Sequence, residues 1–162
     1  MSHIETPTLW YFAYGSNMAR AIFVETRRME PLETLSGWLD GYRLSFNIPI
    51  GPGERGVANV IAEPDGRTHG VVYQLTHADF ERLDASEGVS FGLYRRIPVN
   101  IVTAKRGVIE AWTYRSSVVT DGRKPSLRYR QLLIDGAREN ELPLEYLQYL
   151  EALDLALDER VA

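Results

Sequence analysis

Between residues 9 and 115 the chain is a series of short apolar runs broken by glycine or proline. The runs cover residues 9–14, 36–48, 57–62, 69–75, 94–103 and 108–115. Short runs rich in aromatic and β-branched residues and bounded by turn residues are typical of strands. Pro64-Asp65-Gly66 predicts a tight hairpin turn between the third run and the fourth. Gly41 predicts a bend inside the second run. We therefore expect six short strands.

Helix signals flank these runs and dominate the end of the chain. Helices are expected at about 17–28, capped by Ser16 or Asn17, at 78–86, capped by Thr76 and stopped by Gly88, and at 127–139, capped by Ser126. Pro143 opens a last helix with leucines on one stripe at 144, 147, 150, 153 and 157. Strands followed by helices indicate an α+β fold with a mostly antiparallel sheet. Six short strands could close into a small barrel, which periodicity alone does not prove.

Composition narrows the class of protein. The length of 162 residues suits one compact domain, and 44% of the residues are hydrophobic. The chain has no cysteine, which excludes disulfides, thiolate nucleophiles and cysteine zinc sites, and its three histidines have no metal-ligand spacing. A net charge of -4 argues against nucleic acid as a partner. The basic pairs at 27–28 and 95–96 are interpreted as solvated faces or ion pairs.

The first residues and the hydropathy of the chain predict its location in the cell. Its first residues lack the basic and apolar regions of a signal peptide, and no apolar run approaches the length of a membrane span. We expect a cytoplasmic protein with no membrane partner. Residues 1–8 and 158–162 are expected to be loose termini.

The first candidate for chemistry is Tyr14-Gly15-Ser16-Asn17, where the first strand passes into a helix. A glycine there allows a sharp turn, and the amides that follow could bind a carboxylate or a developing oxyanion. The alternative is an ordinary strand–turn–helix with a capping side chain. No serine hydrolase elbow and no phosphate-binding loop is present.

The second candidate is Glu87, beside the glycine that ends the helix at 78–86. Partial burial would raise its pKa towards the range of a general base. A solvated glutamate at a helix end is the alternative, although an acid is unfavourable at a helix C-terminus. Tyr94 and Tyr129 could present hydroxyls to a pocket, or simply pack in the core or at its rim.

Taken together, these segments resemble the γ-glutamylcyclotransferase family. Residues 11–18 (YFAYGSNM) are similar to its opening motif, and residues 83–89 (LDASEGV), followed by GLY at 92–94, to its catalytic-glutamate segment. Residues 125–129 and 136–146 resemble its C-terminal helices, and residues 70–73 one of its strands. The likeness spans about 10–150 and keeps the family's order.

The resemblance implies a small closed β-barrel with surrounding helices and a pocket at one end. It implies an enzyme that needs no cofactor or metal and cyclises γ-glutamyl amides to 5-oxoproline, with Glu87 as the acid and base. The glutamyl-binding residues it implies are Tyr14, Gly15, Ser16, Asn17, Met18, Tyr94 and Tyr129. Some members dimerise, so a homodimer is left open.

Asn17 resembles the branch of the family that acts on γ-glutamyl amino acids. Related branches that act on isopeptide-linked lysine or on glutathione carry leucine at this position. Met18 departs from the leucine usual in similar members, a volume-conserving change. The loops at 51–56 and 118–124 match no particular member, so the leaving amine is not fixed. Two alternatives remain: removal of a γ-glutamyl protecting group from a biosynthetic intermediate, and a non-catalytic binding domain on the same fold.

Overall fold

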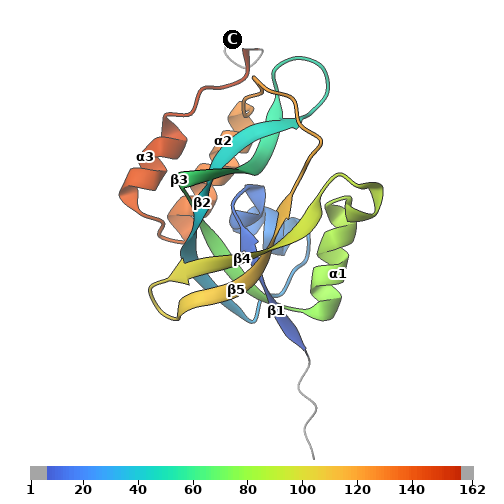
Figure 1. Cartoon of the computed structure of the whole chain (residues 1–162), viewed down its shortest axis with the longest axis vertical. Helices are drawn as coiled ribbons and strands as arrows, with labels where there is room; N and C mark the ends of the chain where they lie inside the picture. Colours follow the sequence, from blue (N-terminus) through green and yellow to red (C-terminus); the bar gives the residue numbers. More distant parts are fainter. Residues whose placement is uncertain (1–6, 158–162) are drawn as a thin grey trace, which may run out of the picture.

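A computed structural model describes residues 7–157 (Figure 1). Five strands form a closed barrel in the order β1-β3-β2-β4-β5. Their bounds are β1 Thr8–Ala13, β2 Glu33–Pro49, β3 Gly56–Thr76, β4 Arg95–Thr103 and β5 Gly107–Arg115. Neighbouring strands pair antiparallel except at the closure, where β1 meets β5 in parallel through Tyr11 and Trp112. The prediction of a closed, mixed and mostly antiparallel barrel is confirmed.

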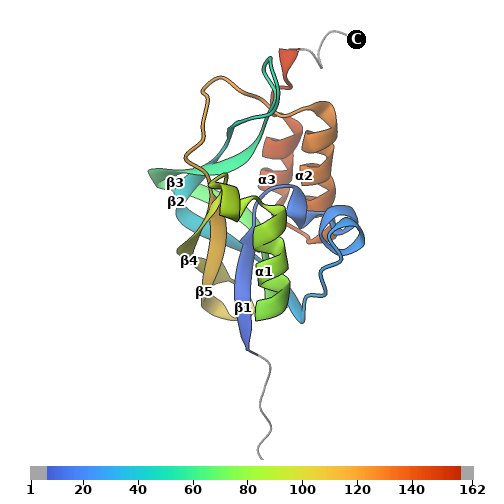
Figure 2. The same ribbon diagram turned by 90° about the vertical axis from the view of Figure 1, so that its right-hand side faces the viewer.

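Helices cover the barrel from two sides. Figure 2 shows α1 (His77–Ser86) in front of β1, while α2 (Leu127–Glu139) and α3 (Leu144–Glu151) pack together on another side of the barrel. Phe80 and Leu83 of α1 are fully buried, and the Phe80 ring meets the ring of Tyr11 edge-on at 5.7 Å. Leu133 of α2 and Leu150 of α3 are fully buried as well. Burial of these apolar side chains fixes the helices on the barrel wall.

The predicted hairpin turn at 64–66 is wrong, and with it the count of six strands. The chain stays extended from Gly56 to Thr76, so the third and fourth runs are two parts of one strand, β3. β2 bends at Gly41, whose φ is +86°, and the register shifts there between Asp40 and Tyr42. β3 follows this bend. A Cβ on Gly66 would lie 2.8 Å from the carbonyl oxygen of Tyr42, so glycine allows the two backbones to approach.

The predicted helix at 17–28 is also wrong. The segment instead holds a 3-10 turn, η1 (Ser16–Met18), and a π-helix, η2 (Ala21–Thr26), and η1 begins without a side-chain cap. The segment then leaves the helical region at Arg28, whose φ is +59°. Because a π-helix differs from an α-helix in its hydrogen-bond spacing, local propensity alone does not predict it.

The other helices begin and end close to their predicted positions. The hydroxyls of Thr76 and Ser126 accept the predicted capping hydrogen bonds from Asp79 N and Tyr129 N, at 3.1 Å each. The last helix stops at Glu151, before the end of the predicted leucine stripe, and Leu144 is 67% exposed. Thr8, expected in a loose terminus, pairs with Thr76 in the sheet. Pro7, also expected in that terminus, accepts a hydrogen bond from His77 N at 3.2 Å. Residues 1–6 and 158–162 of the predicted termini lie outside the described residues.

Candidate active site

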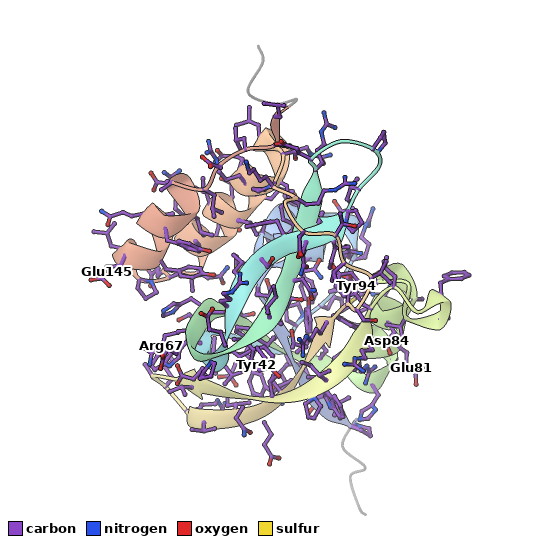
Figure 3. The ribbon with its side chains drawn as sticks, turned by 45° about the horizontal axis from the view of Figure 1, so that its top comes forward. Tyr42, Arg67, Glu81, Asp84, Tyr94 and Glu145 are labelled. Atoms are coloured by element: carbon purple, nitrogen blue, oxygen red, sulfur yellow. The ribbon has the colours of Figure 1, made fainter. Side chains whose placement is uncertain are left out.

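The site lies where β1 ends and α1 ends, on the same side of the barrel. The β1 strand passes into η1 through Gly15, which brings Ser16 and Asn17 to this place. α1 ends at Ser86, with Glu87 as its C-cap residue, because Gly88 adopts a left-handed conformation with φ +69°. Figure 3 shows Tyr94, just before β4, and Asp84 of α1 on one side of the molecule, away from Arg67 and Glu145.

A small cavity of about 40 Å³ brings most of the sequence-predicted residues together. Its lining contains the predicted residues Tyr14, Gly15, Ser16, Asn17, Glu87, Tyr94 and Tyr129. It also contains three residues that the sequence did not indicate: Tyr11, Ala58 and Tyr114. The cavity has room for a few water molecules at most.

Met18 is the exception among the predicted binding residues. Its side chain is fully buried and lies in the hydrophobic core, not in the cavity lining. A Cβ on Gly136 would come within 2.6 Å of the Met18 Cβ, so η1 and α2 pack closely at this point. Met18 therefore holds η1 against α2 through packing.

Glu87 is held by a network that joins three parts of the chain. Asn17 donates its side-chain amide to Glu87 Oε1 at 3.0 Å and to the Tyr11 hydroxyl at 2.9 Å. Arg27 donates from Nε to Asn17 Oδ1 at 2.6 Å, and its guanidinium lies 3.5 Å from Glu87 Oε1. Because arginine can only donate, the Asn17 oxygen must face Arg27 and its amide nitrogen must face Glu87.

Both contacts fall on Oε1 of Glu87. Within residues 7–157, Oε2 accepts no hydrogen bond from another side chain or from the backbone. The Glu87 side chain is only 13% exposed. Glu87 therefore has one anchored oxygen and one oxygen available for proton transfer.

Burial raises the pKa of the Glu87 carboxyl, and the nearby Asp84 raises it further. The positive charge of Arg27 and the hydrogen bond from Asn17 act in the opposite direction, but the net pKa is raised. Asp84 is itself paired with Arg96 at 2.7 Å and accepts from the Tyr114 hydroxyl at 2.6 Å. A carboxyl with a raised pKa in a cavity has the property that a general acid or base needs.

Tyr94 and Tyr129 line the cavity next to Ala58 of β3. The Tyr94 hydroxyl donates to the Ala58 carbonyl oxygen, and the Ala58 N–H donates to the Tyr129 hydroxyl, both at 3.1 Å. A Cβ on Gly15 would lie 2.7 Å from the Tyr129 hydroxyl oxygen. Gly15 is thus in direct contact with the ring that α2 supplies, and a side chain at this position would displace that ring.

Arg27 is the functional candidate that sequence reasoning missed. The pair at 27–28 was interpreted as a solvated face or an ion pair, and Arg27 does form an ion pair, but with Glu87. No local pattern marks this contact, because it depends on η2 and on a partner 60 residues away in the chain. Arg96 likewise forms an ion pair, with Asp84.

No group of three or more metal-ligating side chains that could hold an ion occurs within residues 7–157. In the same part of the chain, no helix has the length and apolar character needed to span a membrane.

Comparisons with known proteins point to one family. The model of the AIG2-like family matches residues 67–150. The γ-glutamylcyclotransferase of Homo sapiens is 31% identical over 150 residues, which cover 89% of this chain and 78% of the human protein. A γ-glutamyl cyclotransferase of Claviceps purpurea is 31% identical over 82% of this chain and 64% of its own length.

A solved structure described as a γ-glutamyl cyclotransferase superposes on this chain with a TM-score of 0.81 at 27% identity, covering 92% of this chain and 89% of the other. Together, the family model, the relatives and the shared barrel show that this chain belongs to the γ-glutamylcyclotransferases of the AIG2-like family.

Proposed function

We propose that the protein converts γ-glutamyl amides of amino acids into 5-oxoproline and the free amino acid, with Glu87 as the proton-transfer residue. The observation that carries the proposal is the buried Glu87 carboxyl, anchored by Asn17 and Arg27 and with Oε2 available, in a family of cyclotransferases. A non-catalytic domain would require a missing or unreachable acid. Glu87 is present and lines the cavity.

The substrate would supply its own nucleophile. Its α-amine attacks its γ-carbonyl carbon, a C–N bond forms, and a five-membered ring closes. The C–N bond to the leaving amine then breaks. Holding the two reacting groups of one molecule in place can contribute an effective molarity of about 10⁵ M or more, roughly 7 kcal/mol of the barrier. This supports a mechanism in which no serine or cysteine nucleophile takes part.

Glu87 would carry the proton between the two nitrogens. It accepts a proton from the α-ammonium, which frees the lone pair for attack, and donates it to the leaving nitrogen as the tetrahedral intermediate collapses. Of the three ammonium protons, one stays on the lactam nitrogen and one passes through Glu87. The third leaves with the released amine or enters solvent. A raised pKa of Glu87 suits both its uptake of the proton from the α-ammonium and its release of the proton to the leaving nitrogen.

The remaining lining residues would bind and enclose the glutamyl group. These lining residues are Tyr14, Gly15, Ser16, Asn17, Tyr94 and Tyr129. A cavity of about 40 Å³ is smaller than a γ-glutamyl group, so side chains must move when substrate binds. The Tyr94 ring is the first candidate to move, because its hydroxyl makes one hydrogen bond within residues 7–157, to the Ala58 carbonyl oxygen, whereas the Tyr129 hydroxyl interacts with both Ala58 and Ser16.

The test is the identity of the product. Purified protein is incubated with γ-glutamyl-alanine, and 5-oxoproline, glutamate and alanine are quantified by chromatography. N-Acetyl-γ-glutamyl-alanine is the matched control, because its blocked α-amine cannot cyclise. We expect equal amounts of 5-oxoproline and alanine, and no reaction of the control. Glutamate as the product, or no product from a panel of γ-glutamyl amino acids, amines and glutathione, would contradict the proposal.

A cytoplasmic location and a homodimer stay predictions from the sequence. The released amino acid is the least specified part of the reaction.

A further inference from the structure

A second hollow adjoins the catalytic cavity. This groove has a volume of about 390 Å³ and lies between η2, the start of β3 and the start of α2. Ser16 and Tyr129 line both the groove and the catalytic cavity, so they form the wall between the two. In Figures 1 and 2 the loop between β2 and β3 lies at the same end of the molecule as the start of α2.

The groove has an apolar wall. Ile22 of η2, Ile50 just after β2, Val57 of β3 and Leu132 of α2 line it. Ile50 is 51% exposed, which is a high value for an isoleucine. The wall suits an aliphatic side chain, because covering such surfaces removes them from water.

The groove is also lined by positive charge. Arg27, Arg55 and Arg128 belong to its lining, and no aspartate or glutamate does, in a chain whose net charge is -4. Arg27 is engaged with Asn17 and Glu87. The exposed guanidinium of Arg128 makes no ion pair or side-chain hydrogen bond within residues 7–157. Arg128 can therefore receive an anion.

The two hollows fit the two halves of a γ-glutamyl amide. The glutamyl ammonium must reach Glu87, which lies in the catalytic cavity. The leaving nitrogen is joined to the γ-carbon and must also lie near Glu87 to receive its proton, but the cavity of about 40 Å³ has no room for the rest of the leaving group. The groove behind Ser16 and Tyr129 is the adjoining space large enough to take it.

We propose that this groove is the leaving-group subsite and selects an α-amino acid with an aliphatic side chain. This inference rests on the proposed cyclotransferase function. The α-carboxylate of the leaving amino acid pairs with Arg128, with Arg55 beside it, and the side chain lies against Ile50, Val57 and Leu132. The preferred substrates are γ-glutamyl derivatives of leucine-like amino acids rather than γ-glutamyl derivatives of simple amines or of glycine.

The carboxylate is tested with a matched pair of substrates. γ-Glutamyl-leucine and γ-glutamyl-3-methylbutylamine differ only in the carboxylate of the leaving group. We expect kcat/KM for 5-oxoproline release to be at least about tenfold higher for the leucine compound, as a charged hydrogen bond of this kind provides. Arg128→Gln should remove most of that ratio. Lys105→Gln, which removes a charge in the exposed turn between β4 and β5, should preserve it.

The apolar wall is tested with γ-glutamyl-leucine against γ-glutamyl-glycine. The leucine compound should have a kcat/KM about tenfold higher or more, since a few methylenes in an apolar pocket give this discrimination. Ile50→Ser, at an exposed position, should lower the leucine-to-glycine ratio without unfolding the protein. Circular dichroism and the melting temperature check that each variant is folded.

The outcomes separate this proposal from the proposed function. No 5-oxoproline from any of the three substrates, or from γ-glutamyl-alanine, would overturn the proposed function. Release of 5-oxoproline at equal efficiency from the leucine and 3-methylbutylamine compounds would overturn the subsite alone. An Arg128→Gln variant that keeps the wild-type ratio would overturn the role of Arg128.

Discussion

Asn17 donates its side-chain amide to Glu87 Oε1 at 3.0 Å, which joins the turn after β1 to the C-terminal end of α1. The two residues are 70 positions apart in the chain and come together because β1 and α1 pack against each other. Through this contact Asn17 positions the carboxylate of Glu87. It fixes one oxygen of the carboxylate, while Arg27 fixes the orientation of the Asn17 amide.

Replacement of Arg27 should change the pH dependence of the reaction. The guanidinium of Arg27 lowers the pKa of Glu87, so its removal in Arg27→Gln should raise that pKa. The acidic limb of kcat/KM, which reports the free enzyme's base, should then move to higher pH. Arg27→Lys, which keeps the charge, should show a smaller move. A pH series of initial rates measures the shift.

Arg28→Gln is the matched control for this experiment. Arg28 is the next residue, is exposed, and carries the same charge. Its replacement should leave the acidic limb where it is. An acidic limb that does not move in Arg27→Gln, or that moves to lower pH, would contradict the effect of the Arg27 charge on the pKa of Glu87.

The stability of the protein should depend on pH through Glu87. The folded pKa of Glu87 lies above the ordinary value of about 4.5, so the folded state holds its proton more tightly than the unfolded state does. The contribution of Glu87 to stability is therefore present at low pH and is lost as pH rises from about 4.5 through the folded pKa. Glutamine does not titrate and lacks this dependence.

Urea unfolding of the wild type and of Glu87→Gln, at several pH values between about 4 and 8, measures this effect. The free energy of unfolding of the wild type minus that of the variant should decrease as pH rises. A difference that grows in favour of the wild type with rising pH would contradict a raised folded pKa.

The sequence identified only some of the site residues that produce these pH effects. The residues at 14–17, Glu87, Tyr94 and Tyr129 could be singled out because each belongs to a short motif or a helix boundary. Both ends of α1 were also predictable, since Thr76 caps its start and the left-handed Gly88 follows its last residues. Arg27 could not be singled out, because its contact with Glu87 depends on packing between distant segments.

In the barrel, too, features set by local sequence were predicted, and features set by contacts between distant segments were not. The strands β4 and β5 were predicted closely, because their apolar runs and the turn between them are local. The path of β3 through Pro64 and Gly66 was not, because the runs on both sides of these residues pair with β2 instead of with each other, which no local signal reveals. Tyr11 was taken as part of a buried strand, and only the tertiary structure places its hydroxyl beside Asn17.

Removal of the Tyr129 hydroxyl should affect the free energy of unfolding more strongly than it affects turnover. In Tyr129→Phe the buried N–H of Ala58 loses its acceptor, with an expected loss of about 1–3 kcal/mol in the free energy of unfolding. Turnover should fall less than in Glu87→Gln. Tyr149→Phe on the surface of α3, where the hydroxyl has no described hydrogen bond, should stay within about 0.5 kcal/mol of the wild type.

Urea unfolding and 5-oxoproline assays on the same preparations compare the two effects. A Tyr129→Phe variant as stable as Tyr149→Phe would show that the Ala58 hydrogen bond contributes nothing. Equal losses of turnover in Tyr129→Phe and Glu87→Gln would require the roles of these residues to be redrawn.

Gly15 and Tyr129 should be coupled. A Cβ at residue 15 would meet the Tyr129 hydroxyl oxygen at 2.7 Å, whereas the next ring atom of Tyr129 lies 4.0 Å away. Gly15→Ala should therefore lower both stability and turnover in the wild type, and should cost less stability when Tyr129→Phe has removed that oxygen. A double-mutant cycle of unfolding free energies measures the coupling. Strict additivity would contradict the contact.

The central claim is that Glu87 carries the proton between the α-amine and the leaving nitrogen, and Glu87→Gln tests it most directly. Glutamine keeps the size of the side chain and an oxygen for Asn17, but cannot accept the proton. The measurement is the rate of 5-oxoproline release from γ-glutamyl-alanine by the two proteins, with unfolding confirming that the variant is folded. We expect loss of turnover in a variant whose stability lies within about 1 kcal/mol of the wild type. Wild-type turnover by folded Glu87→Gln would contradict the account.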